Sequence, residues 1–165
     1  MSVLADFNAE EQRLLLSSLS AAAVAISAAS LGRKVETVSE GFAAAQYILE
    51  VRQPYLANSL IGSLQYEIER RATAGETFPE FEKQATAPGA EGASLETLAA
   101  TAALLDARTD AEEALGFKRW LLDIARVTKE AGKEGGNFFG RGAVAVNDEE
   151  RAAYARMAEV LGVSG

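Results

Sequence analysis

Carboxylates are the side chains whose spacing in this chain comes closest to a chemical site. Asp123, Glu130 and Glu134 follow one another at steps of seven and four residues, in a segment with helical periodicity. Residues at such steps lie near one line along a helix, and clustered carboxylates can hold a hard cation. The acidic pairs that could face them from another helix are Glu36 with Glu40, and Glu67 with Glu69. A carboxylate-based cation-binding protein is therefore one possible function.

The same segment also fits an ordinary solvated helix face. Its charges alternate in sign at steps of four and three residues, through Arg119, Asp123, Arg126, Glu130 and Lys133. Each such pair stabilises a helix by only about 0.2–0.5 kcal/mol. A di-iron site of the ferritin type needs Glu-x-x-His pairs, and the chain has no His. We therefore expect a salt-bridged surface, with cation binding as the alternative.

The residue inventory excludes several classes of catalysis. The chain contains no Cys and no His, so it has no disulfide, thiolate nucleophile or imidazole base. The same absence argues against zinc and haem. An enzyme would have to use carboxylates, Lys, Ser, Thr or Tyr, and no arrangement of these points to a catalytic site. We expect no catalytic residues and no cofactor, and an enzyme is the second alternative.

Glycines and two adjacent phenylalanines mark the segment 135–146. Four glycines lie between residues 135 and 142, where they permit left-handed backbone and close approach of another chain. The order of glycines matches neither the dinucleotide fingerprint nor a P-loop. Phe138, Phe139 and Arg141 are the candidate interaction residues, because exposed aromatic and arginine side chains are common interface anchors. The alternative is a structural turn with one Phe inserted into the bundle.

The elements that must position these residues are helices. The length of 165 residues and the hydrophobic content of 48% predict one all-helical domain, residues 1–165, of about five to seven helices. Asn8 with Glu11, and Thr109 with Glu112, match the capping box that opens a helix. The first expected helix covers about residues 9–31, the second begins at residue 35 or 39 and ends at 52, and the third ends at about 73. The last three cover about residues 94–108, 109–133 and 147–161. Prolines and glycines in residues 75–94 predict a mobile loop that can hold one short turn over residues 79–84.

The first predicted helix has the composition of a buried element. Leu14 to Leu31 are eighteen residues without a charge, mostly Ala and Ser. Their length is close to that of a membrane span. The many Ser residues instead favour a helix at the centre of the bundle, so no membrane span is expected.

Side-chain spacing predicts further packing. One face of the fifth predicted helix is mainly apolar and consists of Phe117, Trp120, Leu121, Ile124, Thr128 and Ala131. We expect this face, with Trp120, to be buried. Gly41, Gly62 and Gly116 lie inside predicted helices, where glycine costs about 1 kcal/mol relative to Ala. Close approach of another helix at each glycine would offset that cost.

Net charge and composition indicate the setting. The formal net charge of −8 argues against nucleic-acid binding, which needs clustered Lys and Arg. The absence of cysteine suits the cytoplasm, and the first residues lack the positive start of a signal peptide. We expect a cytoplasmic protein whose partners are other proteins or further copies of itself.

The end of the chain carries one family resemblance. Residues 146–163 combine an acidic helix start, Asn147-Asp148-Glu149-Glu150, with the closing pattern Met157-Ala158-x-x-Leu161-Gly162. This segment resembles the last helix of TerB-like domains, small all-helical bacterial proteins associated with tellurite resistance and stress response. The resemblance implies a non-catalytic, stress-associated interaction module. It carries no cation site to this chain, because the first predicted helix ends at Leu31-Gly32 without the acid of the family's Ala-Asp-Gly turn.

Overall fold

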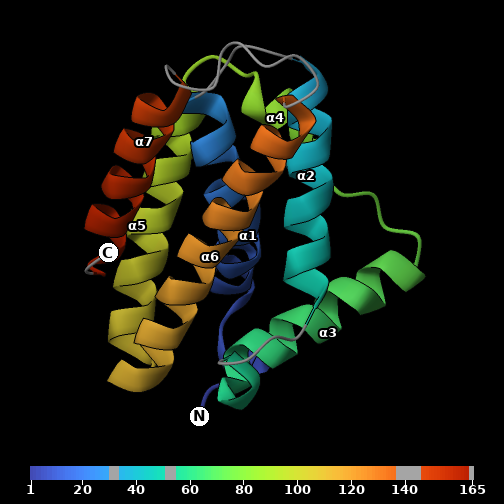
Figure 1. The fold of residues 1–165 in the computed structure, drawn as a ribbon. Coiled ribbons are helices and arrows are strands. Elements are labelled where there is room, and N and C mark those ends of the chain that lie inside the picture. Colours follow the sequence, from blue (N-terminus) through green and yellow to red (C-terminus); the bar gives the residue numbers. More distant parts are fainter. Residues whose placement is uncertain (30–33, 51–54, 137–145, 164–165) are drawn as a thin grey trace.

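Helix α1, Ala9–Ala29, lies at the centre of a helical bundle in the computed structural model of the chain (Figure 1). The structure describes residues 1–29, 34–50, 55–136 and 146–163. The other α-helices are α2 (Lys34–Leu49), α3 (Ser59–Thr73), α4 (Phe81–Ala85), α5 (Ala90–Arg108), α6 (Ala111–Gly136) and α7 (Val146–Leu161), and the 3-10 turns are η1 (Leu4–Asp6) and η2 (Tyr55–Ala57). The described part of the chain contains no strand. The predicted all-α bundle of five to seven helices is confirmed.

Helix α1 is central because its small side chains let other helices approach from several sides. It contacts α2, α4, α5, α6 and α7, and every residue from Ala21 to Ser27 is buried. The buried Ser18 hydroxyl donates to the Leu15 carbonyl at 2.7 Å, so the polar group is satisfied inside the helix. By length and composition α1 could cross a membrane, and 56% of its apolar window is buried in the bundle.

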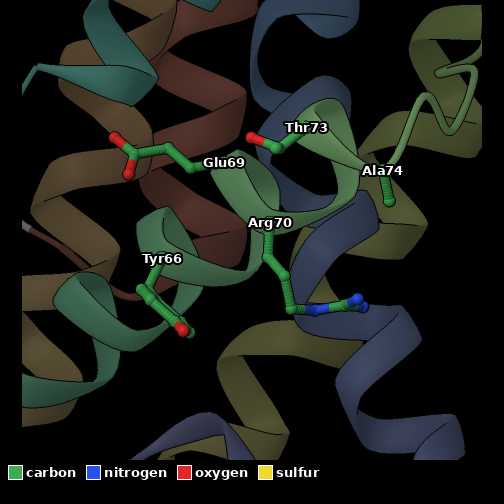
Figure 2. A pocket seen from close by; sticks show the side chains of 5 residues that line it. All are labelled: Tyr66, Glu69, Arg70, Thr73 and Ala74. Atoms are coloured by element: carbon green, nitrogen blue, oxygen red, sulfur yellow. The ribbon is translucent and has the colours of Figure 1, made fainter.

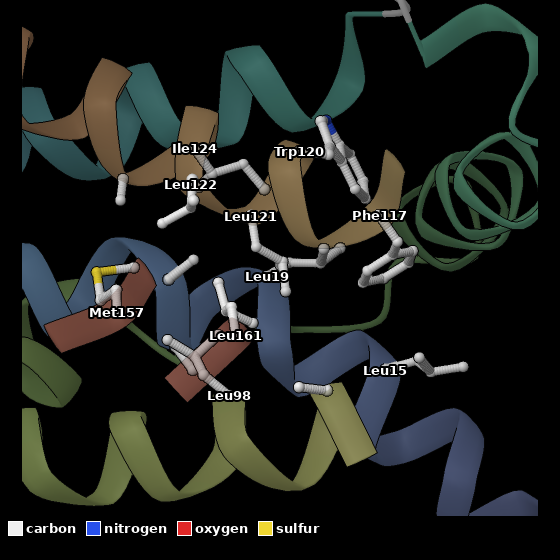
Figure 3. Packing of buried hydrophobic residues seen from close by; sticks show 14 of the residues in the cluster. Leu15, Leu19, Leu98, Phe117, Trp120, Leu121, Leu122, Ile124, Met157 and Leu161 are labelled. Atoms are coloured by element: carbon white, nitrogen blue, oxygen red, sulfur yellow. The ribbon is translucent and has the colours of Figure 1, made fainter. Parts of the chain in front are cut away.

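Helix α6 supplies the largest apolar side chains of the core. Phe117, Trp120, Leu121 and Ile124 are all at most 1% exposed, and Figure 3 shows them packed between α6 and the surrounding helices. The rings of Phe117 and Trp120 meet edge to face, with centroids 5.7 Å apart, a favourable geometry for aromatic rings. The predicted burial of the Trp120 face is confirmed.

Capping bonds fix where the helices begin and end. The side chain of Asn8 accepts from the amides of Glu10 and Glu11, and Glu11 accepts from the Asn8 amide at 2.8 Å, as the capping box predicts. The predicted cap at Thr109 is wrong. The Thr109 hydroxyl donates to the Leu105 carbonyl and closes α5, while Asp110 accepts from the Glu113 amide and opens α6.

Two helices occupy part of the segment 75–94, for which a loop with one short turn over residues 79–84 is predicted. Helix α4 spans Phe81–Ala85, and α5 begins at Ala90, four residues before the predicted start at Ser94. Gly89 has a φ of +73°, a left-handed conformation that lets the chain turn directly into α5. The early start also buries Ala90 against the bundle. Mobility of the remaining loop stays a prediction.

The three interior glycines differ in their surroundings. A Cβ added at Gly41 would lie 2.6 Å from Cδ1 of Phe81, and one at Gly116 would lie 2.9 Å from Nδ2 of Asn58. Gly41 therefore allows the close approach of the whole Phe81 side chain, whereas at Gly116 only the terminal amide of Asn58 is close. A Cβ at Gly62 would meet nothing within 4 Å. The expected close approach is therefore wrong for Gly62, which lies on an exposed face of α3.

Candidate functional site

Two of the acidic candidates on α6, Asp123 and Glu130, form ion pairs with an arginine. Arg126 lies between Asp123 and Glu130, with its Nε 3.3 Å from Oδ1 of Asp123 and its Nη1 3.2 Å from Oε1 of Glu130. The guanidinium therefore takes the place where a cation shared by the two carboxylates would lie. At these three residues the alternating charges form ion pairs along the helix surface, as predicted.

Asp123 also joins three elements of the fold. It accepts a hydrogen bond from the hydroxyl of Tyr55 at 2.7 Å and from that of Tyr47 at 3.3 Å. Burial, followed by the hydrogen bond to Asp123, raises the pKa of the Tyr55 hydroxyl. Because these bonds join α2 and η2 to α6, Asp123 has a structural role in the described fold.

The remaining acidic candidates do not converge on Asp123 within the described structure. Glu40 is buried and bound to the hydroxyl of Ser27 on α1, and Glu67 binds two arginines on α3. The side chains of Glu36 and Glu134 lie outside the described residues. Among the side chains that the structure places, no group of three or more acidic, His or Cys residues could hold a metal ion. Cation binding stays a prediction.

The predicted interaction residues also fall outside the described part of the chain. Phe138, Phe139 and Arg141 lie between Gly136, where α6 ends, and Val146, where α7 begins. Their role as an interaction loop stays a prediction. The structure offers a different candidate surface, on α3.

Helix α3 is attached to the bundle through its first half. Asn58 caps it by accepting from the Ile61 amide at 3.2 Å, and Leu60, Ile61 and Leu64 are buried. The side chain of Gln65 donates to the Ile48 carbonyl at the end of α2, at 2.9 Å. Beyond this bond Ile68 still packs, half-buried, against the core. The rest of the helix leads away from the other helices (Figure 1), and none of residues 69–80 is buried.

An ion-pair network stabilises the outer half of α3. The carboxylate of Glu67 accepts from Nε and Nη2 of Arg70 at 2.8 and 2.9 Å, and from Nε of Arg71 at 2.7 Å. These bonds lower the pKa of Glu67 to about 2. Pairs at steps of three and four residues support a helix locally. The outer half of α3 can therefore stay helical with little help from tertiary contacts.

The outer half of α3 presents one strip of side chains to solvent. Tyr66, Glu69, Arg70, Thr73 and Ala74 line an open hollow of ≈ 390 Å³ (Figure 2). Steps of three and four residues put all five on one side of the helix. Tyr66 is 70% exposed. We call these five residues the α3 strip.

The α3 strip was missed in the sequence because its composition is ordinary. The one available signal is that the last strongly apolar residue of α3 is Ile68, whereas the helix continues to Thr73. No family model, curated protein or solved structure matches this chain. The assignment of function therefore depends on the site itself.

Proposed function

We propose that this protein is a non-catalytic protein-interaction module that binds its partner through the α3 strip. The observation that carries the proposal is the outer half of α3, which extends from the bundle with an exposed tyrosine, Tyr66, at the start of one exposed face. A helix held at one end presents a whole side to a partner. Recognition of a helix face through residues three and four apart is a common mode of protein binding.

Exposed aromatic side chains support an interaction role. Tyr66 and Phe42 are 70% and 72% exposed, and Phe78, in the segment after α3, is 49% exposed. Large aromatic side chains lose apolar hydration when a partner covers them, and they are frequent anchors at interfaces. Tyr66 combines such a ring with a hydroxyl that can remain hydrated at an interface rim.

The geometry of the α3 strip favours binding over catalysis. Its polar groups all come from one helix, and the hollow that they line is open to solvent. A catalytic site needs groups that converge from different elements and a space that excludes water. The α3 strip lacks this convergence, whereas an open, exposed surface suits a macromolecular partner.

The setting of the proposed module follows from the sequence. The resemblance of α7 to the closing helix of TerB-like domains adds a stress-associated role to the proposal. The composition adds a cytoplasmic location, and the partners are other proteins or further copies of this chain.

Photo-crosslinking from position 66 tests the proposal. Tyr66 is replaced in cells by a photoreactive phenylalanine derivative, and Glu96, an exposed residue of α5, is replaced in the same way as a control. We expect discrete adducts of defined mass from position 66 and none of these from position 96. Equal adduct patterns at both positions, or no adducts, would contradict binding through α3.

A further inference from the structure

The two charged residues of the α3 strip, Arg70 and Glu69, differ in their hydrogen bonds to the rest of the chain. Arg70 directs Nε and Nη2 to Glu67, which leaves the Nη1 amino group of the guanidinium for another acceptor. Glu69 is exposed and forms no hydrogen bond or ion pair with any described residue. A carboxylate without a described partner and a guanidinium with a spare donor group therefore occupy adjacent positions in the middle of the strip, and Figure 2 shows the two side chains pointing to opposite sides.

The order of residues along the α3 strip is complementary to itself. When two copies of a helix pack antiparallel about a two-fold axis, each contact occurs twice with the partners exchanged. With the axis between positions 69 and 70, Glu69 of each copy faces Arg70 of the other copy. The same axis places Tyr66 opposite Thr73, a ring against a small side chain. A parallel pairing would instead place like charges together.

We propose that the chain self-associates through the α3 strip, with two α3 helices packed antiparallel about an axis between Glu69 and Arg70. This inference rests on the proposed function, because it names the partner of the α3 strip as a second copy of this chain. The projection of α3 from the bundle suits this arrangement (Figure 1). An antiparallel pair places the two bundles at opposite ends of the paired helices.

The size and charge of the surface predict a weak, reversible dimer. The α3 strip runs from Tyr66 to Ala74, about 12 Å at 1.5 Å per residue. A strip of this length on a single helix buries far less area than a standard protein interface does. Each copy also carries a net charge of −8, which opposes association. We expect a Kd between about 1 μM and 1 mM, the range of transient complexes.

Charge reversal at the two central positions tests the pairing. Glu69→Arg places two arginines opposite two arginines, and Arg70→Glu places two acids opposite two acids. Sedimentation velocity over a concentration series should show that the dimer Kd of each variant alone is at least about ten-fold higher than that of the natural chain. An equimolar mixture should form a heterodimer at least as tight as the natural dimer, because both contacts are then between opposite charges. Glu96→Arg on α5 is the matched control and should leave association unchanged.

The possible outcomes separate this inference from the proposed function. A natural chain that stays monomeric to 1 mM, or a mixture that does not associate, overturns self-association. Circular dichroism checks that Arg70→Glu keeps α3 helical, since the substitution removes both hydrogen bonds from Arg70 to Glu67. If that variant unfolds, the crosslink from position 66 decides instead. An adduct with the mass of two chains supports self-association, an adduct with another protein alone supports only the proposed function, and no adduct contradicts both.

Discussion

Replacing Gly41 and Gly62 with alanine should have opposite effects on stability. Both glycines lie inside helices, where the change to Ala stabilises by about 1 kcal/mol through helix propensity. At Gly62 nothing opposes this gain, because an added Cβ has no neighbour within 4 Å. We therefore expect Gly62→Ala to raise the free energy of unfolding by about 1 kcal/mol.

At Gly41 the added methyl group meets the ring of Phe81. The new Cβ would lie 2.6, 2.9 and 3.2 Å from Cδ1, Cγ and Cβ of Phe81, so the whole side chain must move and not merely its tip. Overpacking of this kind costs about 1–3 kcal/mol. After the propensity gain, Gly41→Ala should lower the free energy of unfolding by about 0–2 kcal/mol. The two variants should thus differ by about 1–3 kcal/mol.

Urea unfolding, followed by the fluorescence of Trp120 and by circular dichroism, measures both variants. The test is completed by a double-mutant cycle with Phe81→Ala, which removes the obstructing ring. In that background Gly41→Ala should become stabilising, by about 1 kcal/mol. The reasoning is refuted if Gly41→Ala stabilises the natural chain as much as Gly62→Ala does, or if its effect is the same with and without Phe81.

Three further predictions concern the core, the tyrosine bonds and the α3 ion pairs. Trp120→Ala should cost about 3–5 kcal/mol in urea unfolding, and the native emission should be blue-shifted; a solvent-like maximum would contradict the burial of this ring. Tyr55→Phe removes a hydrogen bond to the Asp123 carboxylate and should cost about 1.5–3 kcal/mol, whereas no change would show that water replaces it. Because the pKa of Glu67 is lowered from 4.5 to about 2, its stabilisation of α3 is present above pH 4.5 and is lost as the pH falls toward 2. An NMR titration should find the low pKa, and Glu67→Gln should abolish this part of the acid dependence.

Local chemistry explains why most helices could be predicted from the sequence. Some signals depend only on one residue and those close to it in the sequence. Examples are the capping box of Asn8 and Glu11 and the left-handed Gly162, with a φ of +66°. The buried face of α6 follows from spacing in the same way. Such signals do not depend on what the rest of the chain does.

The surroundings of a residue could not be predicted where they depend on distant parts of the chain. Gly41 and Gly62 look alike in sequence, and only the position of Phe81 distinguishes them. The α3 strip likewise depends on how far α3 extends past its last tertiary contacts. Asp123 and Glu130 were placed correctly on one helix face, but their common partner Arg126 determines that this face is an ion-pair ladder.

The central position of α1 has a consequence for synthesis of the chain. Its neighbours α5, α6 and α7 begin at residues 90, 111 and 146, so α1 leaves the ribosome long before the helices that cover it. Translation at about 5–20 residues per second separates the end of α1 from the end of α7 by roughly 7–26 s. During this interval a helix with the length and hydropathy of a membrane span is exposed, and it can be bound by chaperones or by other nascent chains. The yield of folded protein should therefore respond to translation speed and chaperone supply more than the stability of the finished bundle would suggest.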